Sequence, residues 1–202
     1  MTSMFHMSDL GLLPYYLKIE EWLKLCNMSM APLVDATHYR SIVGGLRYLV
    51  YTWLGITFVV GYASQYIEDS WEDHYMAVKH LLRYVAGTRG YGVIYKKEGG
   101  ATLAQIGYND SDMGGDLDDR KSTTDVFFLL GHSPISWQSK KQRVIALSTC
   151  EAKYIAATTA ACQRVWLARL LQELTSKELQ ALTLMVDNKS VISLRLPRNC
   201  QN

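Results

Sequence analysis

The chain has 202 residues, of which 49% are hydrophobic and 20% are charged, and its formal net charge is +2. This length fits one ordinary domain, or one domain plus a fragment. The composition excludes a disordered tail, a collagen and a coiled coil. The near-neutral charge gives no argument for nucleic-acid binding, although it leaves room for a local basic patch.

The cysteines and the N-terminus carry little signal. The four cysteines show no C-x-x-C spacing, and the five histidines form no zinc-like pattern with them. The N-terminus lacks the basic start of a signal peptide, and the most apolar run, residues 54–63, falls short of the roughly 20 residues that span a bilayer. We therefore expect an intracellular protein of the cytoplasm or nucleus with no membrane partner.

The first hundred residues divide into two parts. Residues 1–36 are rich in Met and Leu, show no clean period, and predict a loosely organised segment too short to be a domain. Residues 37–100 predict a small helical bundle. A first helix is expected to be capped at Asp35 or Thr37, and a second apolar stripe covers residues 56–67.

The third helix of this bundle has the clearest expected boundaries. Ser70 with Asp73 three residues later resembles a capping box. An apolar stripe that includes Leu81 and Leu82 follows at helical spacing, and Gly87 ends it.

Residues 101–202 predict an α/β fold. Three successive strands predict an antiparallel meander, and the long helix that follows predicts that the fourth strand lies parallel to one of them. The expected strands cover residues 103–108, 123–130, 133–138 and 182–186, and the long helix starts at Ser148.

Three carboxylates fall at positions where such a fold gathers side chains. Asp110 follows the first strand, Glu151 lies in the first turn of the long helix, and Asp187 follows the fourth strand. Strand ends and a helix start can converge at one rim of an α/β sheet. Three carboxylates favour Mg²⁺ or Mn²⁺, and a metal pair can clamp both oxygens of a phosphodiester under attack.

Each carboxylate also has a purely structural explanation. Asp110 and Asp112 lie in a sequence whose composition favours turns. Glu151 follows Ser148 by three residues, which is the spacing of a capping box, and Asp187 can serve as a helix N-cap. Taken singly, none of these residues specifies a metal site.

A short basic segment lies close to these carboxylates in the sequence. Lys140, Lys141 and Arg143 follow Trp137, a combination that can contact a phosphate backbone. An ordinary solvated turn explains the same residues equally well.

Several ordered sequence blocks resemble the Pol polyproteins of copia-type LTR retrotransposons. The segment that joins reverse transcriptase to ribonuclease H in that family resembles residues 39–49 (YRSIVGGLRYL) and 80–92 (HLLRYVAGTRGYG), and the tail of its reverse transcriptase resembles residues 7–16 (MSDLGLLPYY). Its ribonuclease H domain resembles residues 108–112 (YNDSD), 120–123 (RKST), 135–142 (ISWQSKKQ), 146–152 (ALSTCEA) and 186–188 (VDN).

The resemblance implies a division into three segments. Residues 1–36 would be a remnant of reverse transcriptase, residues 37–100 a helical connection, and residues 101–202 a ribonuclease H-like mixed sheet truncated at its C-terminus. The family activity is cleavage of the RNA strand of RNA–DNA hybrids with two Mg²⁺ ions. The resemblance assigns the catalytic metal ligands to Asp110, Glu151 and Asp187, with Asp112 as the less favoured choice for the first of them.

Departures from the family pattern predict that hydrolysis is weak or lost. The family's fourth acidic residue is expected to be missing, Lys153 stands where an acidic residue is usual, and Asp125 stands where glycine is usual. The alternatives are a non-catalytic remnant and a co-opted nucleic-acid or protein interaction module, even a secreted effector-like one, against which the missing signal peptide counts. The sequence does not predict an oligomeric state.

Overall fold

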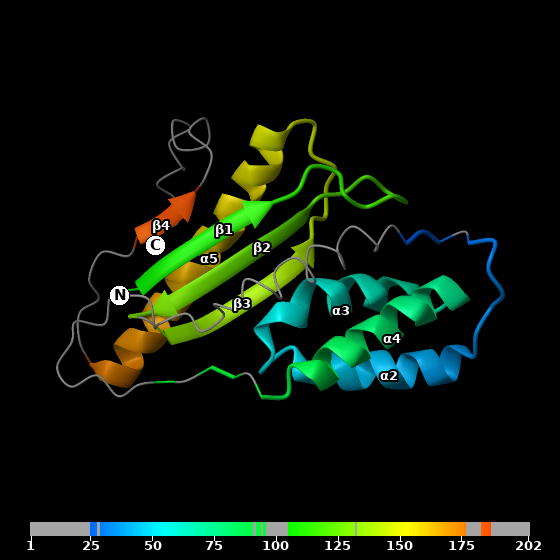
Figure 1. The fold of residues 1–202 in the computed structure, drawn as a ribbon. Coiled ribbons are helices and arrows are strands. Elements are labelled where there is room, and N and C mark those ends of the chain that lie inside the picture. The colour runs from blue at the N-terminus through cyan, green and yellow to red at the C-terminus, as the bar shows by residue number, and fades with distance from the viewer. Residues whose placement is uncertain are drawn as a thin grey trace. The chain divides into compact units, whose positions relative to one another are not determined.

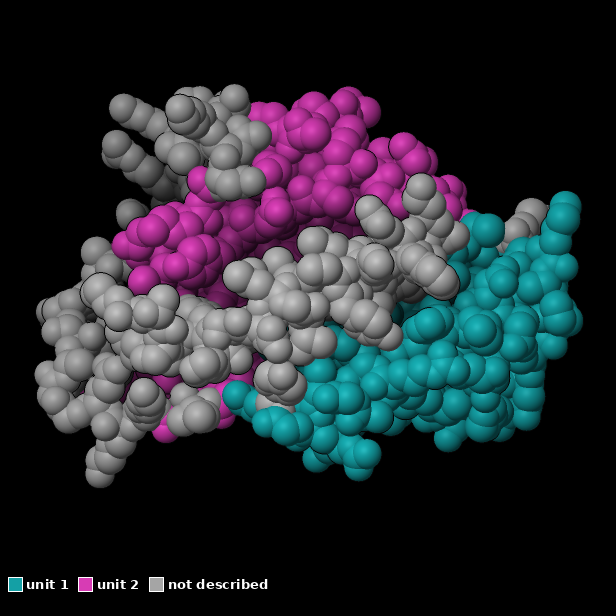
Figure 2. All heavy atoms as spheres, in the orientation of Figure 1, with its two compact units in different colours: residues 1–92 teal, residues 93–202 magenta. Residues whose placement is uncertain are grey.

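The computed structural model describes residues 25–27, 29–90, 92–93, 95, 105–131, 133–176 and 183–186. The chain separates into two compact units, residues 1–92 and residues 93–202 (Figure 2). The finer division into polymerase remnant, helical connection and ribonuclease H-like domain stays a prediction. No helix among the described residues is long and apolar enough to cross a membrane.

The first unit is helical, as the apolar stripes predicted. Asp35 caps its first helix by accepting a hydrogen bond from the Thr37 backbone N–H at 2.8 Å. Leu82, expected in the buried stripe of the third helix, is instead exposed, whereas its neighbour Leu81 is buried. The elements are α2 (Ala36–Leu49), η1 (Leu54–Ile56), α3 (Thr57–Ala63), η2 (Ser64–Tyr66) and α4 (Glu72–Gly87) (Figure 1).

The start of α4 differs from the expected capping box. Nδ1 of the buried His74 accepts a hydrogen bond from the Trp71 backbone N–H at 3.2 Å, so the predicted pairing of Ser70 with Asp73 was wrong. Because a backbone N–H can only donate, the ring proton lies on Nε2, which donates to the Cys26 carbonyl at 3.1 Å. A buried histidine therefore caps this helix.

The segment at residues 25–36 is tied to the helical unit. The hydroxyls of Tyr62 and Tyr66 donate to the Leu25 carbonyl at 2.9 and 3.1 Å. Both tyrosines are buried, so these bonds satisfy hydroxyls that have lost water. The described residues 25–27 therefore contact the helical bundle, and residues 1–24 lie outside the described residues.

The second unit is a mixed α/β sheet with strand order β3-β2-β1-β4. The first three strands are antiparallel neighbours and β4 runs parallel to β1, which confirms the predicted meander and crossover. The elements are β1 (Gln105–Ser111), β2 (Thr123–Leu130), β3 (Ser133–Lys141), α5 (Thr149–Thr175) and β4 (Thr183–Val186) (Figure 1).

Close packing of α5 on the sheet fixes which side of β1 is buried. The buried face of α5 is lined mainly by alanines, whose small side chains let the helix approach the strands. On β1, Gln105, Gly107 and Asn109 are buried. A Cβ at Gly107 would lie 2.5 Å from the Phe128 ring, so only glycine fits there. Side chains alternate along a strand, so Asp110 belongs to the other, exposed face.

Candidate functional site

Asp110 lies one residue before the end of β1, with 65% of its side chain exposed. Its Oδ1 lies 3.3 Å from Nζ of Lys153, which belongs to the beginning of α5. The Ser111 backbone N–H donates to the same carboxylate oxygen at 2.7 Å. The end of β1 and the start of α5 therefore meet at this point, and the helix residue that contacts Asp110 is a lysine.

The carboxylate of Glu151 accepts a backbone hydrogen bond at the start of α5. Its Oε2 accepts from the Leu147 backbone N–H at 2.8 Å, and its own backbone N–H donates to Ser148 Oγ at 3.1 Å. The bond to Ser148 is one half of the capping box that the sequence offered as the structural alternative, whereas the Glu151 carboxylate bonds one residue before the N-cap. A negative charge here also interacts favourably with the helix dipole. Glu151 thus stabilises the helix start.

Asp187 lies outside the described residues, so the expected three-carboxylate site is not tested. The last residue of β4, Val186, pairs with Asn109, which places the end of β4 beside the end of β1. Within the described ranges, no three His, Cys, Asp or Glu side chains are arranged to hold a metal ion. With Asp110 paired to a lysine and Glu151 turned to the backbone, the described residues alone do not fit a pair of Mg²⁺ or Mn²⁺ ions.

Two further carboxylates surround Asp110. Asp125 lies directly opposite it in the β1–β2 register, and Asp112 follows the end of β1. Partial desolvation raises the pKa of both Asp112 and Asp125, and repulsion from Asp110 raises both further. An opposing hydrogen bond from the Thr123 backbone N–H to Asp112 lowers the pKa of Asp112 in part. The residues at this strand end therefore repel one another.

From the sequence alone, Asp125 was recognisable only as a departure from the family pattern. Alternation along β2 was the available signal, because it places Asp125 on the face opposite to the buried Val126. The register with β1, which makes it a neighbour of Asp110, required the structure.

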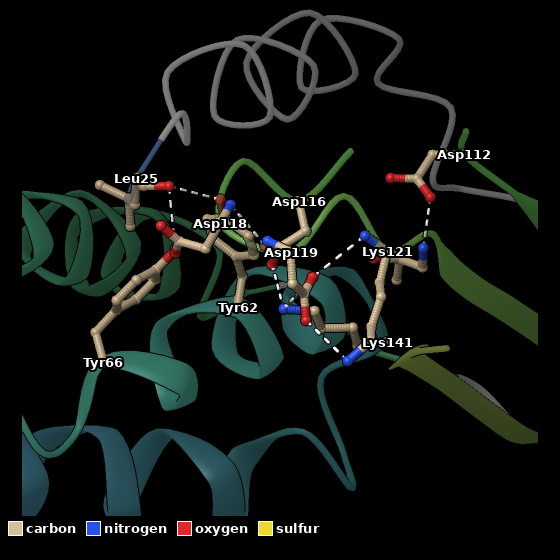
Figure 3. A network of polar contacts seen from close by, with 10 residues as sticks. Leu25, Tyr62, Tyr66, Asp112, Asp116, Asp118, Asp119, Lys121 and Lys141 are labelled. Carbon is tan, nitrogen blue, oxygen red and sulfur yellow. Dashed lines mark hydrogen bonds and ion pairs between the residues drawn. The ribbon is translucent and has the colours of Figure 1, made fainter. Parts of the chain in front are cut away.

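Lys141, one of the three expected phosphate contacts, is held in an ion-pair network (Figure 3). Its Nζ lies 2.6 Å from Asp116 Oδ2 and 3.0 Å from Asp119 Oδ1, and Lys121 lies 3.0 Å from Asp119. Partial desolvation lowers the pKa of Lys141, but its bonds to Asp116 and Asp119 outweigh that effect and raise it. Desolvation by burial raises the pKa of Asp119, but its bonds to Lys141 and Lys121 outweigh that effect and lower the pKa to about 2.

The other two basic residues are more open to solvent. Lys140 at the end of β3 and Arg143 in the following turn are exposed, and Trp137 on the same strand is half-buried. Lys140 and Lys141 are adjacent in one strand, so their side chains point to opposite faces. The three expected phosphate contacts therefore do not form one continuous patch.

Comparison with known proteins identifies the family. The chain is 42% identical over 151 residues to the retrovirus-related Pol polyprotein from transposon RE1 of Arabidopsis thaliana, a match that covers 75% of this chain and 10% of that protein. The Pol polyprotein from transposon TNT 1-94 of Nicotiana tabacum is 41% identical over 169 residues, with 83% and 12% covered. The chain belongs to the Pol polyproteins of copia-type retrotransposons. It spans about a tenth of the length of these Pol polyproteins.

A shorter relative matches over almost its whole length. The secreted RxLR effector protein 161 of Plasmopara viticola is 41% identical over 130 residues, which cover 64% of this chain and 90% of that protein. No protein-family model matches the chain, and no solved structure matches it.

Proposed function

We propose that residues 93–202 form a ribonuclease H-like module that binds RNA–DNA hybrids and whose metal-dependent hydrolysis of the RNA strand is weak or lost. The observation that carries this proposal is the meeting of Asp110, at the end of β1, with the start of α5 in a mixed sheet. Membership of the copia-type Pol family supports it. We also propose that the protein acts in the cytoplasm or nucleus.

The hybrid-binding half of the proposal rests on exposed basic residues. Lys140 and Arg143 are assigned to the phosphate backbone, since both are exposed close to the end of β3. Lys141 is assigned to positioning the loop that carries Asp116 and Asp119, because its ammonium is engaged by both carboxylates. Two phosphate contacts predict moderate affinity that falls as salt rises, because binding releases counterions from the nucleic acid.

The catalytic half rests on the carboxylates. Any hydrolysis is expected to use Mg²⁺ or Mn²⁺ held by Asp110, Glu151 and Asp187, and the metals would activate water and stabilise the leaving oxygen. Among these residues, Asp110 pairs with Lys153 and Glu151 accepts from the Leu147 backbone. Each 1.36 kcal/mol of lost transition-state stabilisation costs about tenfold in rate. Weak or absent turnover is therefore the expected state.

The test combines binding and cleavage on one sample of the whole chain. Fluorescence anisotropy with a labelled RNA–DNA hybrid should show salt-dependent binding that the double variant Lys140→Gln/Arg143→Gln weakens at least about tenfold. Incubation with Mg²⁺ or Mn²⁺ should give little or no more product than the Asp110→Asn variant gives. A folded wild-type sample that does not bind the hybrid would refute the binding proposal, and rapid cleavage that Asp110→Asn abolishes would refute the loss of hydrolysis.

A second candidate function is a protein interaction module. It is supported by the near full-length similarity to a secreted effector and by an exposed apolar turn between β3 and α5. In that turn Val144, Ile145 and Leu147 expose 55%, 54% and 86% of their surface. If the folded chain does not bind RNA–DNA hybrids even at low salt, that result would favour this candidate over the first.

A further inference from the structure

We infer that Lys153 takes the place of a divalent cation at Asp110, so that a residue of the chain itself neutralises the acidic end of the sheet. This inference rests on the proposed function and deepens it, because it names the residue that sets the metal dependence of the site. It makes Lys153 a determinant of metal affinity and a positioning residue for Asp110.

The first argument is the geometry of the pair. Lys153 Nζ lies 3.3 Å from Asp110 Oδ1, which is ion-pair distance. The Lys153 side chain is only 20% exposed, whereas that of Asp110 is 65% exposed. Lysine commonly buries its aliphatic stem and keeps its ammonium near a counter-charge or water. The helix therefore delivers a positive charge to the carboxylate while the carboxylate stays open to solvent.

The second argument is helical spacing. An α-helix has 3.6 residues per turn, so Glu151 and Lys153 point about 200° apart around α5. When Lys153 faces Asp110, Glu151 therefore faces away from it. The contact of Glu151 with the Leu147 backbone N–H at 2.8 Å agrees with this. Position 153 of the helix therefore faces the end of β1. In this chain that position carries Lys153, whose ammonium is not a metal ligand.

The third argument is local charge. Asp110, Asp112 and Asp125 lie close enough that their negative charges repel one another. Lys153 offsets part of that repulsion from within the chain. A divalent cation approaching Asp110 would meet the ammonium at the same oxygen and be repelled by it. The pair therefore supplies the charge balance that a metal would otherwise provide and also opposes metal entry.

The experiment is a titration of the whole chain with Mn²⁺ alone, followed by electron paramagnetic resonance of the free ion. The wild type and Asp110→Asn should bind Mn²⁺ equally weakly. Lys153→Glu places a carboxylate beside Asp110 and should bind Mn²⁺ at least about tenfold more tightly. Lys153→Gln, which only removes the charge, should gain a smaller, Asp110-dependent affinity. Adding Asp110→Asn to Lys153→Glu should abolish the gain.

Lys79→Glu is the matched control, since Lys79 pairs with Glu72 at 3.6 Å on α4 and the net charge changes by the same amount. It should leave Mn²⁺ binding unchanged. Asp110-dependent binding by the wild type as tight as that of Lys153→Glu would overturn the inference. The inference would also be overturned if neither Lys153 variant gained Mn²⁺ affinity. If circular dichroism shows that Lys153→Glu does not fold, the result for Lys153→Gln decides.

Hybrid binding measured on the same samples separates this inference from the proposed function. If the metal results hold and hybrid binding is absent, the proposed function fails and the role of Lys153 stands. If hybrid binding is present and the Lys153 variants gain no Mn²⁺ affinity, the inference fails and the hybrid-binding proposal stands.

Discussion

The two units of this molecule satisfy their buried groups differently. The helical unit packs aromatic and branched side chains into one large cluster, and the buried Tyr39 hydroxyl donates to the Ala63 carbonyl at 2.9 Å. The sheet unit has a thinner cluster around Phe128 and buries the side-chain amides of Gln105 and Asn109 without hydrogen-bond partners among the described residues. Unsatisfied buried groups cost stability, so the unit with the candidate site is expected to be the weaker one.

The largest expected effect comes from the centre of the thinner cluster. Phe128→Ala should destabilise the sheet unit by about 3–5 kcal/mol, because Phe128 is 1% exposed and its loss leaves a cavity. The rate of backbone amide hydrogen exchange, measured by mass spectrometry, should then rise across β1 to β3 and stay unchanged in α2 to α4. Equal acceleration in both units would show that they unfold as one and would break the comparison.

A second substitution tests whether buried amides weaken the sheet unit. Asn109→Val removes both unpartnered amide atoms from a strand position that favours β-branched residues, and it should stabilise the unit by about 1–2 kcal/mol. Urea unfolding gives the change. A loss of stability instead would mean that Asn109 has a partner outside the described residues.

A third substitution tests the ion-pair network of Figure 3. Asp119 has a folded pKa of about 2, below its ordinary value, so its stabilising effect is present above the unfolded pKa and is lost as pH falls through about 2. With 35% of its side chain exposed, solvent screening limits the cost of Asp119→Asn at pH 7 to about 1 kcal/mol or less. The difference in Tm between variant and wild type should shrink from pH 5 to pH 2. A difference that does not change with pH would contradict the assignment.

The smallest effect concerns the repulsion at the end of β1. Burial and the neighbouring carboxylates raise the pKa of Asp125, so its contribution favours folding at low pH and opposes folding as pH rises through the folded pKa. Asp125→Asn should therefore stabilise the sheet unit at pH 7 by about 0.5 kcal/mol and change little at pH 3. Thermal unfolding at the two pH values measures this. Destabilisation at pH 7 would show that the Asp125 carboxylate makes a net favourable contact.

Local signals explain what could be predicted of the fold. The strand Thr123–Leu130 and the cap at Ser148 agree with the sequence, because alternation and capping are short-range effects. β3 runs to Lys141, beyond the expected end at residue 138, since its last residues pair with β2 although their side chains show no apolar alternation. The cap of α4 was missed because His74 takes that role only when it is buried in the folded unit.

The candidate site was predictable only in part, because the sequence carries short-range signals but not the packing of one element on another. The position of Asp110 near a strand end follows from sequence alone. Which residue of α5 faces it depends on how the helix is rotated on the sheet, and neither strand nor helix signals encode that rotation. The family resemblance assigned the metal-ligand role on α5 to Glu151, whereas Lys153 makes the contact with Asp110.

The most direct test of the central claim is the location of Mn²⁺ in crystals of the wild-type chain soaked with the ion. Anomalous scattering identifies Mn²⁺ independently of any assumed ligand set. The expected result is no anomalous peak within coordination distance of Asp110, with the ammonium of Lys153 at ion-pair distance from that carboxylate. A Mn²⁺ peak bound to Asp110 and Glu151, with Lys153 displaced, would contradict the account.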